Sequence, residues 1–482
     1  MSHNPRSLYD VVSDAPRRPV FTKDQLTALS QRIIHFTTAD VVSVSVTHTA
    51  RVVSRMANGR VLTNDDGDEL DILVCTMFGE KGMVQIRVNQ LDDTMLRAAV
   101  TRAEAIARMV TGYSEPVKPI QRTVQDSYVP VHLWHDDTID AMTTTRETVI
   151  PELLETVSRA GLNAAGFLGF MARSEAALTK EGIFAFNEET DCELTITARS
   201  DDNRSSGWGG QAARSWSQIQ PAAVAARAIE MAHRSANPVA VEPGRRTAIL
   251  SPEAVVQLLR FLSGEFNAFP TDQGGTAFSR HPRGNKLGQH VFDSRLKMGS
   301  DPADPDGGYR PYFGSYSQLG LGNPAMTWIE GGVLKNLAYD VGWAMVKGKT
   351  YADIPSSFRL SGGTTTVDEM IAQCREGIYV NRFSGVELLD LSTGLSTGVT
   401  RDGCFLVKDG KISKSVKNFR FLESPFFFLN RIEALGVPVR ATFGYTPPAP
   451  TNDGAATWPR PPIIVPPMMV RDFNFCSLAD AV

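Results

Sequence analysis

Cysteine is scarce in the 482-residue sequence: its five copies are widely spaced, odd in number and free of any Cys-x-x-Cys pair. This distribution argues against a disulfide framework and against a thiolate zinc site, and it suits a reducing compartment. The cysteines are Cys75, Cys192, Cys374, Cys404 and Cys476. Because Cys404 falls in a predicted strand, we expect it to be a small buried side chain rather than a nucleophile.

Long hydrophobic runs are also missing. Residues 1–20 are polar and contain no apolar segment of the kind that a secretory signal needs. The longest strongly apolar stretch after them, Pro425–Leu429, is far shorter than the roughly 20 residues of a membrane helix. We therefore expect a soluble, cytoplasmic protein without a membrane partner, and a flexible arm at residues 1–20.

An excess of positive charge is absent as well. The formal net charge is −4 and the isoelectric point is about 6.1, which argues against a broad nucleic-acid footprint. Apolar residues make up 42% of the chain and charged residues 21%, as in an ordinary globular protein. The length predicts two or three domains.

The N-terminal part alternates helix and strand patterns. Apolar spacing predicts a helix over residues 22–36, and residues 42–47 and 51–56 read as two successive strands. Asn58-Gly59 predicts a hairpin turn, and a second turn is expected at Asn64–Gly67. This order is typical of a compact α/β unit, which we expect to span residues 21–115 and to end with a long helix at 92–111.

Hairpin signals dominate the C-terminal half. Gly331-Gly332 and Asp409-Gly410 each separate two apolar runs. Ser251-Pro252-Glu253 predicts a helix start, with that helix ending near Ser263. The proline-rich tail at 461–469 is predicted to be an edge strand. We expect residues 116–240 to form a connector with central helices and strands, and residues 241–482 to form a β-rich domain.

Short motifs add little chemistry. Gly207–Gly210 lacks the Lys-Ser/Thr of a phosphate-binding loop, so a flexible turn near a groove is the favoured interpretation. His132 and His135 form the only close histidine pair, and in an extended segment their rings would point to opposite faces, which disfavours a metal. The aromatic stretch Phe421–Phe428 and Trp328 are predicted to be core.

Longer patterns are more informative. Such patterns include Gln31–Asp40, Asn89–Ala107, Ser300–Pro302, Trp328–Asp340 and Thr400–Pro425. Together with other stretches between about Leu26 and Val470, they resemble the TldD/PmbA family, a group of peptidase-related proteins. The resemblance implies a dimer-forming α+β protein with an N-terminal α/β lobe, built on a mixed sheet, and a C-terminal strand-rich, barrel-like lobe. It also implies an extended peptide that binds in a groove as an added strand.

The family contains two kinds of subunit. The TldD kind carries HExxxH on a helix, with a later cysteine, and binds zinc, whereas the PmbA (TldE) kind lacks these ligands. At the corresponding positions this sequence has Val255, Val256 and Arg260, and Pro438–Met469 contains no cysteine. Since a catalytic zinc needs three protein ligands, we expect this chain to bind no cofactor and zinc to sit on a TldD-type partner.

Three functions remain open. The first is a non-catalytic PmbA/TldE-type subunit that pairs with a TldD-type zinc subunit or with itself and helps to cleave extended peptides. The second is a stand-alone peptide or amide hydrolase that acts on a small-molecule or natural-product intermediate. The third is a non-enzymatic peptide-binding homodimer. For the second, the candidate catalytic residues are Glu253, Glu265, His281, His290 and Arg401.

Overall fold

The structure is a computed structural model that describes residues 19–79, 81–111, 128–280, 282–312, 321–442 and 461–479. Its N-terminal lobe is built on one six-stranded sheet with the order β3-β2-β1-β4-β5-β6. The strands are β1 Val41–Ala57, β2 Arg60–Phe78, β3 Lys81–Val88, β4 Asn163–Thr179, β5 Phe184–Arg199 and β6 Ser206–Ala213. The helices that the structure describes beside them are α2 Lys23–His35, α3 Asp93–Val110, α4 Asp136–Arg159 and α5 Pro221–Arg234, with a 3₁₀ turn at Trp216–Gln218.

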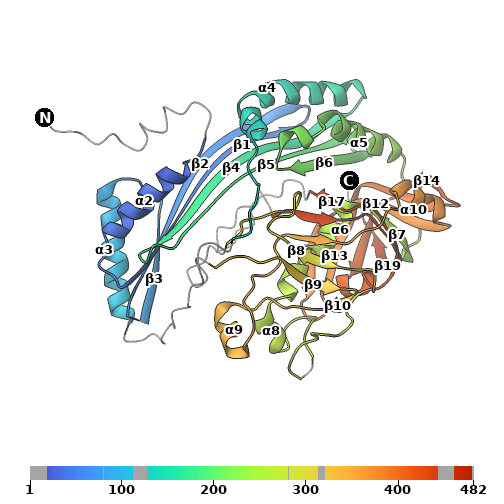
Figure 1. Cartoon of the computed structure of the whole chain (residues 1–482). Helices are drawn as coiled ribbons and strands as arrows, with labels where there is room; N and C mark the ends of the chain where they lie inside the picture. The colour runs from blue at the N-terminus through green and yellow to red at the C-terminus, as the bar shows by residue number, and fades with distance from the viewer. Residues whose placement is uncertain are drawn as a thin grey trace.

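The two faces of this sheet differ because side chains alternate along each strand. Even-numbered side chains such as Val44, Val74 and Leu194 are buried and belong to the apolar clusters that the helices cover. Figure 1 shows α2 and α3 over one end of this outer face and α4 and α5 over the other. The odd-numbered positions of β4 and β5 carry charges, among them Arg173 and Glu189, and turn toward the C-terminal lobe.

The long hairpin β1–β2 corrects part of the predicted pattern. Residues 42–47 and 51–56 belong to one strand, and the predicted turn at Asn64–Gly67 lies inside β2, where Asn64 pairs with Ser54. Turn-forming residues are tolerated there because this part of β2 is exposed on the polar side of a long, paired ribbon. The turn at Asn58-Gly59 is confirmed, with φ of 52° and 68°.

The C-terminal lobe contains a closed barrel. Strands run in the order β12-β7-β19-β15-β13, and β13 pairs back with β12. Their bounds are β7 Gly244–Leu250, β12 Glu376–Asp390, β13 Leu395–Lys408, β15 Phe419–Glu423 and β19 Met468–Leu478, with β14 Lys411–Ser415 and β16 Ile432–Leu435 attached. The stacked rings of Phe383 and Phe473 and the buried Phe421 fill this region, as the sequence predicted for Phe421.

A second sheet has the order β10-β9-β8-β11-β18-β17. Its strands are β8 Met298–Ser300, β9 Met326–Glu330, β10 Val333–Leu334, β11 Phe358–Leu360, β17 Val439–Ala441 and β18 Ile463–Val465. The helices of this lobe are α6 Pro252–Leu259, α7 Leu262–Glu265, α8 Ala268–Asp272, α9 Val341–Lys347, α10 Val367–Gln373 and α11 Pro425–Phe428. The predicted α+β class with a strand-rich C-terminal lobe is confirmed, as are both predicted hairpin turns.

Four local predictions about pairing and packing are corrected. The pairings of the N-terminal sheet are antiparallel, whereas we expected a mixed sheet. The tail at 461–469 is no edge, because β18 lies between β11 and β17, and β19 between β7 and β15. The helix from Pro252 ends at Leu259, before the separate turn α7. Gly207–Gly210 lies in β6 rather than in a flexible turn.

The glycines of β6 allow close contact with α5. A Cβ at Gly207 would lie 2.2 Å from the carbonyl oxygen of Ala228, and a Cβ at Gly209 would lie 2.4 Å from that of Val224. Only glycine lets the strand backbone approach the helix so closely. The glycine cluster therefore serves helix–sheet packing.

The predicted boundary between residues 21–115 and 116–240 falls within one sheet, because strands from both ranges pair in it. The proposed division of the chain stays a prediction, and the expected arm at 1–20 lies almost wholly outside the described residues. In the described part of the chain, every helix is too short or too polar to pass through a lipid bilayer.

Candidate binding sites between the two lobes

Helix α6 contains Val255 and Val256, and Arg260 follows it directly; these are the positions at which the sequence resemblance places the metal-binding motif. Val255 and Val256 are fully buried in the apolar core of the C-terminal lobe, and only Arg260 lies at a pocket. Within the described residues, no three His, Cys, Asp or Glu side chains gather closely enough to hold a metal ion. Valine side chains offer no lone pair and a guanidinium repels a cation, so these residues do not fit zinc.

Arg260 instead belongs to a pocket of about 490 Å³ between α6, the barrel and one end of the N-terminal sheet. We call it the arginine pocket and define it by its charged residues and one amide: Arg55, Arg199, Arg260, Arg382, Arg401, Asp402 and Gln257. Trp208, Phe167 and Phe383 are among its apolar walls. The guanidinium of Arg382 lies 5.2 Å from the ring centre of Trp208, a cation–π distance.

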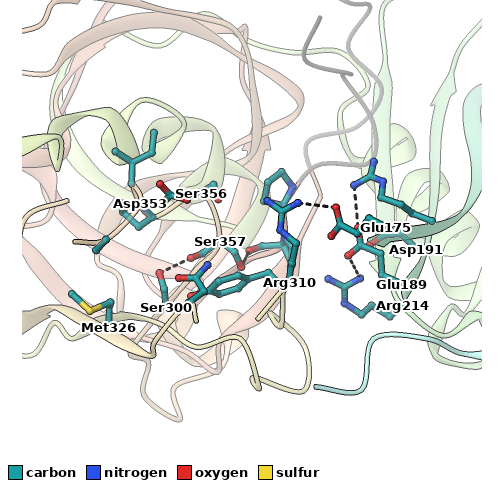
Figure 2. Close-up of a pocket in the computed structure, with 18 of the residues that line it drawn as sticks. Glu175, Glu189, Asp191, Arg214, Ser300, Arg310, Met326, Asp353, Ser356 and Ser357 are labelled. Carbon is teal, nitrogen blue, oxygen red and sulfur yellow. Dashed lines mark hydrogen bonds and ion pairs between the residues drawn. The ribbon is translucent and has the colours of Figure 1, made fainter. Parts of the chain in front are cut away.

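A second hollow, the interlobe cavity, lies further along the same sheet face and has a volume of about 240 Å³ (Figure 2). Strands β4, β5 and the end of β6 supply one wall, and loops around residues 300–310 and 352–357 supply the other. The charged lining residues are Arg173, Glu175, Glu189, Asp191, Arg214, Arg310 and Asp353.

Opposite charges pair across this cavity. Arg310, in the 300–310 loop of the C-terminal lobe, donates to Glu175 at 2.7 Å, and Figure 2 shows the two side chains pointing toward each other. The neighbouring carboxylate, Glu175, raises the pKa of Arg310, which is therefore always charged. This contact ties the loop to β4 and helps to fix the cavity's shape.

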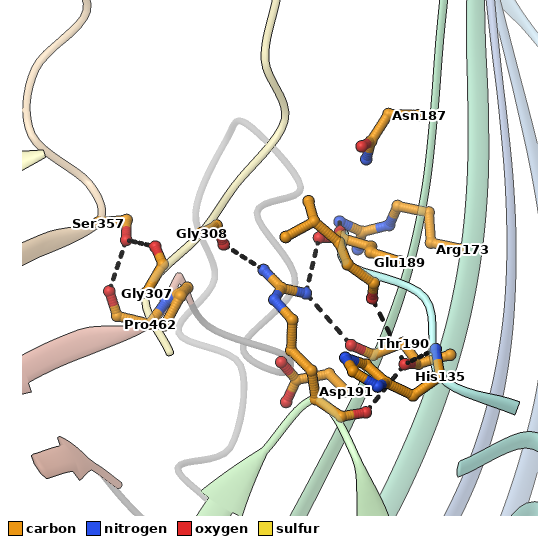
Figure 3. Close-up of polar contacts among 12 residues, drawn as sticks. His135, Arg173, Asn187, Glu189, Thr190, Asp191, Gly307, Gly308, Ser357 and Pro462 are labelled. Carbon is orange, nitrogen blue, oxygen red and sulfur yellow. Dashed lines mark hydrogen bonds and ion pairs between the residues drawn. The ribbon is translucent and has the colours of Figure 1, made fainter. Parts of the chain in front are cut away.

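Glu189 receives two guanidinium groups, from Arg173 at 3.0 Å and from Arg214 at 3.1 Å. Burial alone would raise its pKa, but Arg214 and Arg173 outweigh burial and hold the pKa below its ordinary value. Arg214 also donates to the carbonyl oxygens of Thr190 and Gly308, so it joins β5 to the loop of the other lobe (Figure 3).

The predicted candidate residues separate into different places. Arg401 and Arg260, the latter at a metal-helix position, both line the arginine pocket. Glu253 is half-buried. Burial raises its pKa, although Arg227 acts to lower it. Glu265 accepts the backbone N–H of Ala277 at 2.7 Å, and burial raises its pKa to about 7.

One further predicted residue, His290, does not join a site. His290 is exposed and forms an isolated bridge with Val333. His281 lies outside the described residues. The predicted residues therefore do not assemble into an acid–base pair in the part of the chain that the structure describes.

The histidine pair behaves differently from expectation. The rings of His132 and His135 lie 5.1 Å apart, edge to face, so the prediction that they point to opposite faces is wrong. His135 is the N-cap of α4 and has an extended backbone, and its N–H donates to the Thr190 hydroxyl oxygen at 3.1 Å. Burial and the nearby His132 lower the pKa of His135. Among the described residues no third ligand completes a metal site here.

Sequence reasoning missed most of the charged lining. Glu189, Asp191 and Glu193 alternate with uncharged residues along β5, as do Arg173 and Glu175 along β4. Charges at every second position of a strand that is otherwise apolar indicate a polar face in contact with something other than the helices. That signal was present, but the partner wall comes from distant loops.

The fold defines a class of protein: a long, helix-backed antiparallel sheet opposite a closed barrel, with polar hollows between them. Residues 243–477 match the family model described as the PmbA/TldA metallopeptidase C-terminal domain. Residues 243–477 are therefore similar to the C-terminal domain of that metallopeptidase family. A comparison with curated proteins finds no matching sequence.

Solved structures share the whole fold. A protein from Thermotoga maritima described as a candidate modulator of a DNA gyrase superimposes with a TM-score of 0.76 at 16% identity, over 94% of this chain and 98% of its own. TldE from Thermococcus kodakarensis gives 0.76 at 14% identity, over 93% and 99%. A candidate gyrase modulator from Bacteroides thetaiotaomicron gives 0.71 at 17% identity, over 94% and 99%. At these identities the likeness concerns the fold alone.

Proposed function

We propose that the chain is a PmbA/TldE-type, non-catalytic subunit of a TldD/PmbA-family metallopeptidase assembly that binds extended peptides. The observation that carries the proposal is helix α6. Two of the positions that would hold the metal-binding motif are valines packed in the core, and the third is an arginine. A partner with an intact motif would supply the zinc and the activated water.

Two findings support this assignment. Residues 243–477 are similar to the family's C-terminal domain. The fold likeness to TldE from Thermococcus kodakarensis extends over 93% of the chain. Neither finding separates the two subunit types, so the proposal depends on the residues of α6.

The interlobe cavity is the proposed peptide site. An extended peptide carries an amide and a carbonyl at each residue, and polar walls on both sides can pair with them. Glu175, Glu189 and Arg214 lie on the sheet side, while Asp353 and Ser356 lie on the loop side. We infer that the peptide lies between the two walls and that the partner subunit completes the site.

A stand-alone hydrolase is the weaker alternative. It would need a general acid and a general base near one another and near a bound substrate. Glu265 has a pKa near the useful range, but its carboxylate is 3% exposed and accepts the Ala277 N–H. A peptide-binding homodimer remains the third hypothesis, and it predicts self-association with no effect on a partner's rate.

The decisive experiment is reconstitution with a TldD-type protein from the same genome. The two chains are produced separately and together, and complex formation is measured by size-exclusion chromatography with light scattering. We expect cleavage of an unfolded reporter peptide only by the mixture, with zinc bound to the partner. A partner whose metal-binding histidines are replaced is the control. Absence of a complex, or cleavage by this chain alone, contradicts the proposal.

A further inference from the structure

The lining of the arginine pocket is positively charged, whereas the chain as a whole carries a net negative charge. Five arginines and one carboxylate, Asp402, contribute to its lining, whereas the whole chain has a formal net charge of −4. The arginines come from separate elements: β1, β5, the end of α6, β12 and β13. Folding therefore gathers cations that are far apart in sequence, at the electrostatic cost of their mutual repulsion.

Asp402 does not neutralise this cluster. The closest atoms of its carboxylate lie 3.6 Å from Arg382 and 3.9 Å from Arg401, longer than the about 2.8 Å of a charge-assisted hydrogen bond. Its Oδ1 atom is buried and has no hydrogen-bond partner among the described residues. The two arginines thus keep unused N–H groups next to a carboxylate that is held at a distance.

The guanidinium groups remain available from inside the pocket. No described residue accepts a hydrogen bond from the side chain of Arg382, which is only 19% exposed. Arg401 is 30% exposed, and within the part of the chain that the structure describes its one ion pair is the long contact with Asp402. Burial lowers the pKa of Arg382, which reflects the cost of holding this cation away from water. A buried cation with free donors is the arrangement that an anionic ligand satisfies.

The apolar walls narrow the ligand class. Trp208, Phe167, Phe383 and Met56 line the pocket beside the arginines, and a volume of about 490 Å³ exceeds what a bare inorganic anion fills. The ligand should therefore combine a carboxylate with an apolar or peptide body. Arg382 is already oriented by the ring of Trp208, so its planar fork is prepared for a planar carboxylate.

We propose that the arginine pocket binds a carboxylate of a peptide ligand. This carboxylate is either a Glu or Asp side chain of the peptide or the peptide's own C-terminus. The assignment of a peptide rests on the proposed function, whereas the recognition of a carboxylate rests on the pocket's own residues. The site makes the chain selective for acidic peptides. It holds the carboxylate of the peptide while the rest of the peptide extends along the sheet face.

The test uses the full chain alone and three acetylated alanine-based pentapeptides. One has a central Glu and an amidated end, one has a central Gln and an amidated end, and one has Ala throughout and a free C-terminus. Isothermal titration should show that at least one carboxylate peptide binds about tenfold or more tightly than the Gln peptide. The preference should weaken as salt rises.

Two substitutions should act in opposite directions. Arg401→Gln removes an N–H donor and a positive charge, and should reduce the carboxylate preference about tenfold. Asp402→Asn removes the competing negative charge and should strengthen binding. Asn tolerates the left-handed backbone at this position, where φ is 52°. Arg204→Gln, at a side chain that is 82% exposed and outside the pocket, is the matched control and should change nothing.

The outcomes are separable from those of the proposed function. Equal affinity for the Glu, Gln and free-end peptides, or the same result for Arg401→Gln and wild type, overturns the carboxylate site. Inorganic phosphate that binds more tightly than every peptide overturns it as well. Complex formation and cleavage with the TldD-type partner are measured independently, so either proposal can fail while the other stands.

Discussion

Arg440 and Asp191, 249 residues apart in the sequence, form a buried ion pair with an Nη2–Oδ2 distance of 2.6 Å. Their side chains are 9% and 4% exposed. Two residues further along both segments, Thr442 donates to Glu193. Strand β17 of the C-terminal lobe is thereby fastened to β5 of the N-terminal sheet, between the interlobe cavity and the arginine pocket.

This contact predicts a large loss on truncation of one partner. Arg440→Met leaves Asp191 buried without its cation, and breaking such a pair costs about 3–5 kcal/mol. The burial that raises the pKa of Asp191 indicates how unfavourable its isolated charge is. Urea unfolding of the variant should show this loss in the transition that involves the lobe interface.

The matched control is Arg204→Met, because the Arg204–Asp202 pair is exposed and 3.8 Å long. Its expected cost is about 0–1 kcal/mol. A double variant, Arg440→Met with Asp191→Leu, should recover part of the loss, since the buried charge is removed with its partner. Equal stability of Arg440→Met and wild type contradicts the role assigned to the pair.

The local elements could be predicted because their signals are local. Caps, glycine turns and apolar periodicity placed α2, α3 and the hairpin at Asp409-Gly410 correctly. The turn predicted at Asn64–Gly67 failed because pairing with β1 outweighs the turn preference of those residues. The prediction of a flexible turn at Gly207–Gly210 failed for a similar reason. Glycine is needed there because of contact with α5, a separate element.

The candidate site could be predicted only in part. The resemblance pointed to α6, and the structure places Arg260 and Arg401 in one pocket. The resemblance could not indicate that Arg382 lies beside Trp208 or that Arg440 pairs with Asp191, because those neighbours come from strands far apart in the chain. Charge gathered by long-range topology leaves no short motif.

Glu265 predicts a specific pH dependence of stability. Its pKa is raised to about 7 by burial, whereas an unfolded Glu titrates near 4.3. Between these values the folded state holds a proton that the unfolded state has released. The stabilisation is therefore fully present below about pH 4 and is lost as pH rises through about 7.

Glu265→Gln should remove this dependence, because the amide is neutral and its oxygen can still accept the Ala277 N–H. The variant should match wild type near pH 4 and exceed it above pH 8 by on the order of 1–3 kcal/mol. Thermal unfolding across pH 4–8 measures the effect. Glu155→Gln, at a side chain that is 68% exposed, should leave the pH profile unchanged. Parallel profiles for wild type and Glu265→Gln contradict the raised pKa.

Gly207 predicts a steric requirement. The Cβ added by Gly207→Ala would meet the Ala228 carbonyl oxygen and the Ala232 amide nitrogen, each at 2.2 Å. Because both are backbone atoms of α5, the helix must shift, and we expect a loss of at least about 1–3 kcal/mol. Gly264→Ala is the control, since nothing lies within 4 Å of its Cβ position. Similar melting temperatures for the two variants contradict this account of β6.

The last prediction concerns the metal positions themselves. Val255→His, Val256→Glu and Arg260→His together restore the spacing of HExxxH, but we expect no stable zinc site. Val255 and Val256 are fully buried among apolar residues, so Glu at 256 would bury an unpaired carboxylate at a cost of several kcal/mol. Two histidines also fall short of the three protein ligands that a catalytic zinc requires. Zinc content after dialysis, measured by mass spectrometry, and thermal unfolding test this expectation.

Arg260→His alone is the control and should change stability by less than about 0.5 kcal/mol, because that side chain is exposed. A folded triple variant with one equivalent of tightly held zinc would contradict this expectation and would show that these three residues alone separate this chain from a zinc-binding subunit.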